Sequence, residues 1–448
     1  MSHAQGLHAN LAARAHGARG RMPSSVFRRA VTPLPGPDDI LRRVLPNGIT
    51  VLSRENFSSP SVVIEGYVTA GSLDETAELM GLASYTGAML SRGTRKRSFA
   101  EINETVESVG AAVGFSTDRY TTSFSAKSLA EDLGLVLDVL CDELRQPAFP
   151  AEYVEKVRGI RLTALAEREN NTRHMASVTF RELCFPNHPL GYTQLGTSET
   201  INRITREALV EFYERYYSPR DMVIVVVGAV AAEEAMARVS EVFGDWSPRR
   251  EDGAKLPPVV RPSRTVQRHV LMPNKSQSDI VLGWQSMQRS ATDYEAARLA
   301  NTVLGVFGMS GRLGANVRER QGMAYYAYSQ LSADRLPGIW ALIAGVNPAN
   351  VTRAIEAMTE EANRLAQETV PESELEDSKH YLTGSLPLQL ETNDGVAGTL
   401  VDLEWHKLGF DYIRRYTDMI QNLTAQDVQA AAQKYLSADG YVLAVAGP

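Results

Sequence analysis

The sequence predicts an α+β fold made of two homologous domains, each a mostly antiparallel sheet packed with helices. Short stretches rich in β-branched residues predict strands, and longer stretches with apolar residues every three or four positions predict amphipathic helices. The stretch from Ile204 to Gly228 also aligns without a gap with the stretch from Leu423 to Gly447. Both predict a capped helix followed by a valine-rich strand, so the chain contains a two-copy repeat of about 200 residues per copy.

The length of the chain and a stretch rich in Pro and Gly indicate how it divides into segments. At 448 residues it is too long for one hydrophobic core. We expect a disordered basic tail over residues 1–40 and a first α+β domain over 41–245. A polar stretch rich in Pro and Gly begins at Trp246 and predicts a linker over 246–264. The second α+β domain is then expected over 265–448.

The predicted elements of the first domain follow from local patterns. Ser98 and Glu101 form a capping box that opens a helix ending at Gly110. The stretch 222–228 is uniformly apolar and predicts a strand buried on both faces. The other elements expected here are strands over 49–53, 61–69 and 120–126, and helices over 129–145, 151–169 and 205–217.

The second domain repeats this pattern. Strands are expected over 279–286, 340–346 and, less regularly, 325–329, and helices over 292–305, 311–320, 349–367 and 372–385.

Composition and charge limit the function classes. The net charge of −7 argues against nonspecific nucleic-acid binding, which needs a basic face. No run of about 18 apolar residues is present, so we expect a soluble chain with no membrane partner. Cys141 and Cys184 belong to no metal-binding motif and are expected to be buried small apolar residues.

The first 30 residues carry five arginines and no acid but lack the apolar core of a secretory signal. We therefore expect a cytoplasmic bacterial protein, and organelle targeting by the basic tail stays open as an alternative.

Residues 81–94 carry the most informative motif, Gly-Leu-Ala-Ser-Tyr-Thr-Gly-Ala-Met-Leu-Ser-Arg-Gly-Thr. They predict the start of a buried helix that ends at Gly93-Thr94. The segment resembles the metal-binding helix of the insulinase/pitrilysin-type zinc peptidases, which carry the inverted motif H-x-x-E-H in the same frame. Ser84, Gly87 and Ala88 stand at the two His positions and the Glu position of that motif.

Several other segments carry the same resemblance, which covers residues 41–448. It implies two homologous α+β halves with the fold of metallopeptidases of the LuxS and processing-peptidase type. It also implies a distal zinc-binding Glu on a later helix, and Ala164 stands at that position. The supporting segments are Ala70–Glu75, Phe185–Gly191 with Leu195–Thr197, Gly308–Leu313 and Arg318–Tyr325.

The vacated positions predict that this chain holds no metal and no other cofactor. Zinc needs imidazole or carboxylate ligands and one position left for water, and serine, glycine and alanine supply none of these. No two histidines of the folded part lie one helical turn apart. Gly87 costs a helix about 1 kcal/mol relative to alanine. It is explained either by drift after loss of function or by room made for a neighbouring chain or peptide.

Arg318 and Tyr325 match the second-domain signature of the family. The resemblance implies that the matching pair reaches the zinc site of the opposite domain and binds the substrate carbonyl and oxyanion. A guanidinium and a phenol both donate hydrogen bonds to developing negative charge. Tyr326 and Tyr328 are rivals to Tyr325 if the register differs.

By this resemblance, the zinc-binding residues of the catalytic site are therefore replaced, while the Arg/Tyr pair is kept. This predicts a non-zinc subunit of a heterodimeric zinc metallopeptidase, whose partner is a sister chain that carries the zinc motif and whose substrate is a peptide added as a strand to a sheet edge. The alternative is a structural or assembly subunit of the processing-peptidase or respiratory-core type. An active peptidase with other catalytic residues is a third hypothesis, but no other constellation is identified from spacing.

Overall fold

The computed structural model describes residues 34–248, 256–306, 311–436 and 440–448, and Pro35–Pro448 form one compact unit. The predicted tail up to residue 33 and the centre of the predicted linker, residues 249–255, lie outside the described residues. The exact domain limits stay predictions. No helix in the described ranges is both long and apolar enough to cross a membrane.

The first half contains a six-stranded sheet with the order β1-β2-β6-β3-β5-β4. β2 and β6 pair in parallel and the other neighbours pair antiparallel. The strands are β1 (Leu41–Val44), β2 (Thr50–Glu55), β3 (Ser61–Val68), β4 (Ala112–Thr117), β5 (Thr122–Leu129) and β6 (Val223–Gly228). The helices are α1 (Leu82–Met89), α2 (Phe99–Ser108), α3 (Leu133–Arg145), α4 (Ala151–Glu169), α5 (Thr172–Cys184), α6 (Ser198–Arg203), α7 (Arg206–Tyr216) and α8 (Ala232–Phe243).

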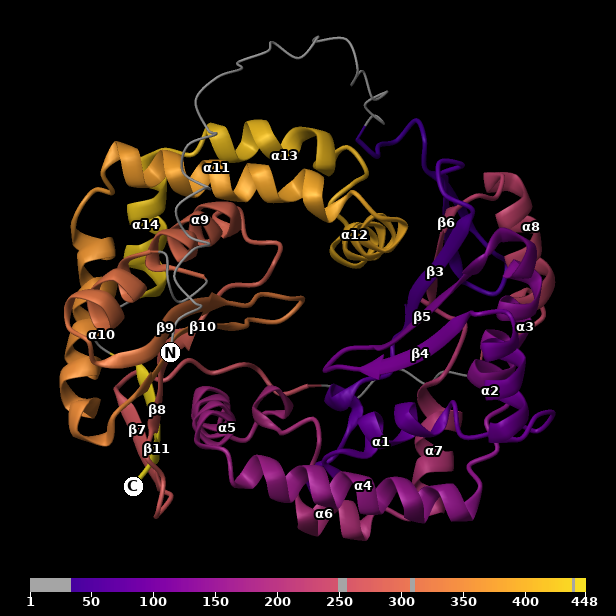
Figure 1. Cartoon of the computed structure of the whole chain (residues 1–448), viewed down its shortest axis with the longest axis horizontal. Helices are drawn as coiled ribbons and strands as arrows, with labels where there is room; N and C mark the ends of the chain where they lie inside the picture. Colours follow the sequence, from indigo (N-terminus) through magenta and orange to yellow (C-terminus); the bar gives the residue numbers. More distant parts are fainter. Residues whose placement is uncertain (1–33, 249–255, 307–310, 437–439) are drawn as a thin grey trace, which may run out of the picture. The chain divides into compact units, whose positions relative to one another are not determined.

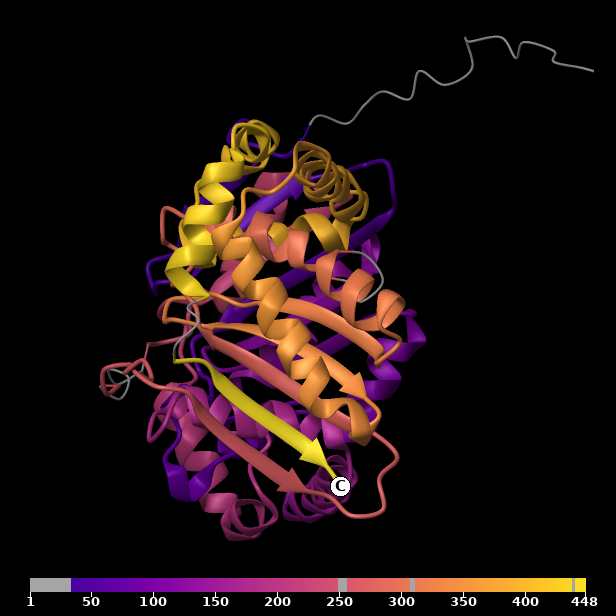
Figure 2. The same ribbon diagram turned by 90° about the vertical axis from the view of Figure 1, so that its left-hand side faces the viewer.

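The second half contains a five-stranded sheet with the order β7-β11-β8-β10-β9. Figure 2 shows β7 and β11 side by side with their arrowheads pointing the same way, as their parallel pairing requires. The strands are β7 (Val266–Leu271), β8 (Ser278–Gln285), β9 (Ala324–Leu331), β10 (Ile339–Val346) and β11 (Val442–Gly447). The helices are α9 (Tyr294–Leu304), the π-helix η5 (Gly314–Arg320), α10 (Val351–Gln367), α11 (Glu372–Gln389), α12 (Asn393–His406), α13 (Tyr412–Gln421) and α14 (Ala425–Tyr435).

The two sheets share one topology, which confirms the prediction of two homologous α+β halves. The run β2-β6-β3-β5-β4 corresponds strand by strand to β7-β11-β8-β10-β9. The repeat found at 204–228 and 423–447 is α7 with β6 and α14 with β11. Both strands are buried along their whole length, because helices cover both faces of each sheet.

The two halves exchange helices. α5 comes from the first half but packs on β8 and β11 of the second sheet, whereas α12 comes from the second half and packs on β3 and β6 of the first (Figure 1). Phe180 of α5 lies in an apolar cluster with Val281 and Ala444, and Leu400 of α12 lies in another with Val63 and Val225. This exchange joins the halves through two apolar interfaces.

Some local expectations were wrong. The helix expected to run to Gly93 ends at Met89, because the chain turns at Leu90–Arg92 and Gly93 then takes a left-handed φ of 117°. A helix is present where one was expected over 311–320, but over Gly314–Arg320 it is the π-helix η5; residues 308–310 of its family signature lie outside the described residues. The capping box of Ser98 and Glu101 at the start of α2 is confirmed.

Candidate functional site

Ser84, at the first vacated ligand position, is fully engaged with its own chain. Its Oγ donates to the carbonyl oxygen of Gln194 at 2.6 Å and accepts from Arg161 Nη1 at 3.1 Å. The other terminal nitrogen of Arg161 donates to the Ser84 carbonyl oxygen. The side chain that replaces a metal ligand therefore ties α1 to α4.

Arg161 brings a positive charge to this position. Its guanidinium lies over the Tyr85 ring at 4.9 Å, and burial lowers the pKa of Arg161 to about 10, so it stays charged at neutral pH. A fixed cation beside Ser84 repels a metal cation. Ala164 lies one turn further along the same face of α4, and its methyl group offers no ligand atom.

Gly87, at the position of the general base, faces a side chain that leaves no room for a Cβ atom. A Cβ built on Gly87 would lie 2.2 Å from Thr117 Oγ1 of β4. That hydroxyl is 3.0 Å from Thr122 Oγ1, which lies 2.9 Å from the hydroxyl of Tyr217. Burial raises the pKa of Tyr217, so this chain of hydroxyls stays neutral. The space beside Gly87 is thus filled by the same chain.

Ala88, at the second His position, is half-buried and packs against the first apolar core. Within the part of the chain that the structure describes, no three His, Cys, Asp or Glu side chains are grouped so that they could hold a metal ion.

Arg318 and Tyr325 differ from Ser84 in having no hydrogen-bond partner within the described residues. Arg318 lies on η5 and Tyr325 near the start of β9, which is one of the two edge strands of the second sheet as described. The Tyr325 side chain is 65% exposed and Arg318 is half-buried. Among the described residues, neither side chain forms a hydrogen bond or an ion pair. No such contact joins them to α1 or α4 either.

The rival tyrosines are bound within the chain. The Tyr326 hydroxyl donates to the buried carboxylate of Asp279, and the Arg173 guanidinium donates to the Tyr328 hydroxyl. Arg173 also lies 4.8 and 5.4 Å from the centres of the two tyrosine rings. Because side chains alternate along a strand, Tyr325 points away from this cluster. Of the three tyrosines, Tyr325 alone forms no hydrogen bond within the described residues, and it is the most exposed.

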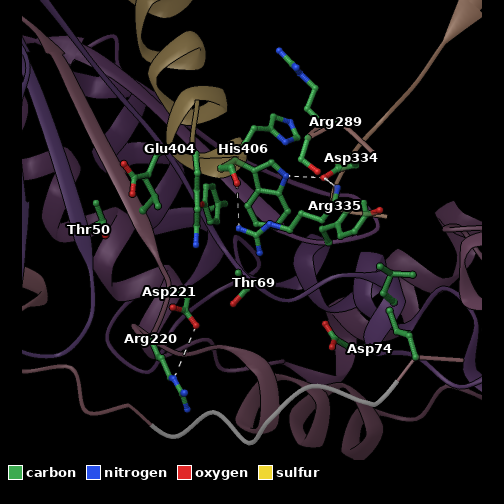
Figure 3. A pocket seen from close by; sticks show the side chains of 18 residues that line it. Thr50, Thr69, Asp74, Arg220, Asp221, Arg289, Asp334, Arg335, Glu404 and His406 are labelled. Carbon is green, nitrogen blue, oxygen red and sulfur yellow. Dashed lines mark hydrogen bonds and ion pairs between the residues drawn. The ribbon is translucent and has the colours of Figure 1, made fainter. Parts of the chain in front are cut away.

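A cavity of about 770 Å³ lies elsewhere, between α12, β3, β6 and the β9–β10 hairpin (Figure 3). Arg335 lies 3.4 Å from the centre of the Trp405 ring, and Asp334 accepts from Trp405 Nε1 at 2.8 Å. None of the predicted site residues lines it. Sequence reasoning missed this cavity because its walls come from distant segments with no common motif. Its charged lining residues are Asp74, Arg220, Asp221, Arg289, Asp334, Arg335, Glu404 and Lys407, which are four cations and four anions.

Solved structures share this fold. The chain superposes on a peptidase M16 inactive-domain protein from Pseudomonas fluorescens with a TM-score of 0.85, 24% identity and coverage of 91% of this chain and 98% of that one. A protease from Helicobacter pylori gives a TM-score of 0.85 at 19% identity, with 93% and 100% covered. These likenesses show the fold alone.

Sequence comparison identifies the family. An uncharacterized zinc protease of Streptomyces coelicolor is 29% identical over 89% of this chain and 87% of its own length. The uncharacterized zinc protease YmxG of Bacillus subtilis is 27% identical over 79% and 85%, and the rat mitochondrial-processing peptidase subunit beta is 25% identical over 90% and 83%. Residues 50–198 match the family described as insulinase (peptidase family M16), and residues 203–382 match the peptidase M16 inactive domain. The chain therefore belongs to the M16, or insulinase, peptidase family.

Proposed function

We propose that this chain is the catalytically incomplete subunit of a heterodimeric zinc metallopeptidase. It supplies Arg318 and Tyr325 to an active site whose zinc is held by a sister chain with an intact H-x-x-E-H motif. The observation that carries the proposal is the contrast between the two regions. The former ligand positions are engaged within the chain, whereas Arg318 and Tyr325 have no partner among the described residues.

The chemistry of the pair suits this role. Zinc in the sister chain would activate the attacking water. Arg318 and Tyr325 would donate hydrogen bonds to the substrate carbonyl oxygen, where negative charge develops during attack. A guanidinium is permanently charged and a phenol is a neutral donor, so both are ready to donate at neutral pH. Such donors gain strength in a cleft from which substrate has displaced water.

The substrate is proposed to be a peptide bound as an added strand. In the sheets as described, β4 and β9 each pair with a strand on one side only, so their other edges offer backbone donors and acceptors. Because the peptide would be recognised through its backbone, its side-chain sequence would matter little for binding. The bacterial relatives named as zinc proteases support a peptide substrate, and the location that we propose is the bacterial cytoplasm.

The test is to purify the chain together with a zinc-bearing M16 sister and to measure kcat and KM on a fluorogenic peptide. Arg318→Ala and Tyr325→Phe are each expected to lower kcat about 10²- to 10³-fold, as loss of an oxyanion donor does. Arg353→Ala, at an exposed position of α10, is the matched control and should leave kcat unchanged. If both site variants keep the activity of the unaltered pair, the proposal is wrong.

The alternative is a structural subunit of the processing-peptidase or respiratory-core type with no role in proteolysis. The likeness to a mitochondrial-processing peptidase subunit favours it. In that case the Arg318→Ala and Tyr325→Phe variants would restore growth to a deletion strain as well as the unaltered chain does. The chain would also co-purify with partners that lack the zinc motif.

A further inference from the structure

A second and smaller cavity, of about 160 Å³, lies where three segments meet. They are the turn between β4 and β5, helix α5, and the hairpin 332–338 between β9 and β10. The turn and α5 each contribute an arginine to its wall, Arg119 and Arg181.

These two arginines are half-buried. In the described ranges, neither forms a hydrogen bond or an ion pair, and the buried Nε of Arg119 is unsatisfied. Burial lowers the pKa of both groups, that of Arg181 to about 10, and the charge of Arg119 lowers the pKa of Arg181 further. The two cations are therefore close enough to repel each other.

The two carboxylates in the wall of this cavity, Asp118 and Asp334, accept hydrogen bonds from other groups. Asp118 accepts from the backbone amides of Tyr120 and Thr121, both at 2.7 Å, and so closes its own turn. Asp334 accepts from Trp405 Nε1 at 2.8 Å. Neither carboxylate forms an ion pair with Arg119 or Arg181 in the described part of the chain. Among the described residues, the two arginines thus face one small cavity without an ion pair, although the charge of Asp118 offsets part of the effect of burial on the pKa of Arg119.

Such an arrangement is costly when the cavity is empty. A buried charge is tolerated when it is paired and hydrogen-bonded, and like charges disfavour each other. An oxyanion with several acceptor oxygens would satisfy both guanidinium groups at once, because arginine matches carboxylate and phosphate geometry. The volume exceeds that of several water molecules, at about 30 Å³ each, so it admits such a group.

We propose that Arg119 and Arg181 form a binding site for one oxyanion group, a carboxylate or a phosphate. This site is separate from Arg318 and Tyr325 and does not depend on the proposed peptidase role. The β4–β5 turn of the first half and the hairpin 332–338 of the second half both line the cavity, so a bound anion would lie between the two halves.

The first experiment measures binding of inorganic phosphate to the full chain by titration calorimetry at constant ionic strength. We expect saturable binding that is at least about tenfold weaker in Arg119→Gln and in Arg181→Gln. Arg353→Gln, an exposed arginine on α10, should bind as the unaltered chain does. Absence of saturable binding, or equal binding by all three variants, overturns the proposal.

The second measurement separates a binding role from a structural one. Without anion, Arg181→Gln removes a repulsive charge, so its Tm should equal or exceed that of the unaltered chain. With phosphate, the unaltered chain should gain Tm and the variant should not. A variant that is destabilised to the same degree with and without phosphate would mean that Arg181 serves packing alone, and this overturns the proposal.

The source of the anion is identified by competition. A short peptide with a free C-terminal carboxylate is compared with the same peptide as its amide, each against bound phosphate. Displacement by the acid alone identifies a peptide carboxylate, and displacement by neither peptide identifies a free phosphate-like anion. Displacement by both peptides would overturn recognition of an oxyanion. Since no hydrolysis is measured, the result is independent of whether the heterodimer hypothesis holds.

Discussion

The α1 region and the η5–β9 region differ in whether their motif residues contact the rest of the chain. Around α1, Ser84 is hydrogen-bonded to Gln194 and Arg161, and Gly87 is packed against Thr117. On η5 and β9, Arg318 and Tyr325 are without partners in the described part of the chain. The first region is a folding element, because its contacts are all internal. The second makes few internal contacts, which agrees with the binding role that we propose for Arg318 and Tyr325.

The largest effect that sharpens this comparison is expected at Gly87. Gly87→Glu restores the general base of the motif, but it forces a carboxylate into the space of Thr117 and should cost about 3 kcal/mol or more of unfolding free energy. Gly87→Ala should cost about 1–3 kcal/mol, although alanine favours a helix by about 1 kcal/mol. Urea denaturation measures both.

The matched control is Gly159→Ala on α4, where a Cβ meets no atom within 4 Å. This variant should be more stable than the unaltered chain by up to about 1 kcal/mol. Adding Thr117→Ala to Gly87→Ala should recover stability, since it removes the clash. Equal stability of the two glycine variants would mean that α1 is not constrained as described.

A smaller effect separates Tyr325 from its neighbour. Tyr326→Phe removes one donor from Asp279, which is fully buried and also accepts from Thr172 Oγ1 at 2.6 Å and Gln277 Nε2 at 3.0 Å. The loss should cost about 1–2 kcal/mol of unfolding free energy. Tyr325→Phe should stay within about 0.5 kcal/mol, as exposed substitutions do. A large cost for Tyr325→Phe would break the comparison, because that residue would then serve the fold.

The last effect is a pH dependence at a strand position where the two halves differ. Glu65 on β3 pairs with Val225 of β6, and Val281 on β8 pairs with Ala444 of β11. Val225 and Ala444 are equivalent in the repeat, so Glu65 and Val281 occupy equivalent positions. Burial, with Asp394 and Asp402 of α12 adding to it, raises the pKa of Glu65 from 4.5 to about 7. The folded chain then holds a proton that the unfolded chain releases, so stability falls as pH rises from 4.5 to 7.

Glu65→Gln should remove this loss. Its Tm advantage over the unaltered chain should grow between pH 4.5 and 7 and stay constant above. Glu131→Gln, at an exposed position, should show a difference that does not vary with pH. If the Tm difference for Glu65→Gln is also constant with pH, burial against α12 does not raise the pKa of Glu65.

The sequence was sufficient for the features that depend on neighbours along the chain. The valine-rich run of β6, its partner β11, and the capped helices α7 and α14 before them were all predicted, because capping and apolar runs act locally. The family motif located α1, and the spacing of Arg318 and Tyr325 followed from the same resemblance. Their accessibility did not, since it depends on which face of β9 packs against α5.

What could not be predicted depends on contacts across the fold. Thr117 is 30 residues from Gly87 in the sequence, and only the placement of β4 against α1 brings its hydroxyl to that glycine. Arg119 and Arg181 are also far apart in the chain and share no motif. The apolar face of α12, with Leu400 and Leu403, indicates that the helix needs a partner but does not say which sheet supplies it.

The exchange of α5 and α12 also fixes an order of events during synthesis. All strands of the first sheet have been synthesised once β6 leaves the ribosome. The apolar face that α12 covers stays exposed until α12 is made, after most of the second half. At 5–20 residues per second this interval lasts roughly 10–35 s. During it, Val223, Val225 and Val227 have no cover from the helix that later protects them. The nascent first half therefore exposes this apolar face until α12 is made, and such exposure favours aggregation.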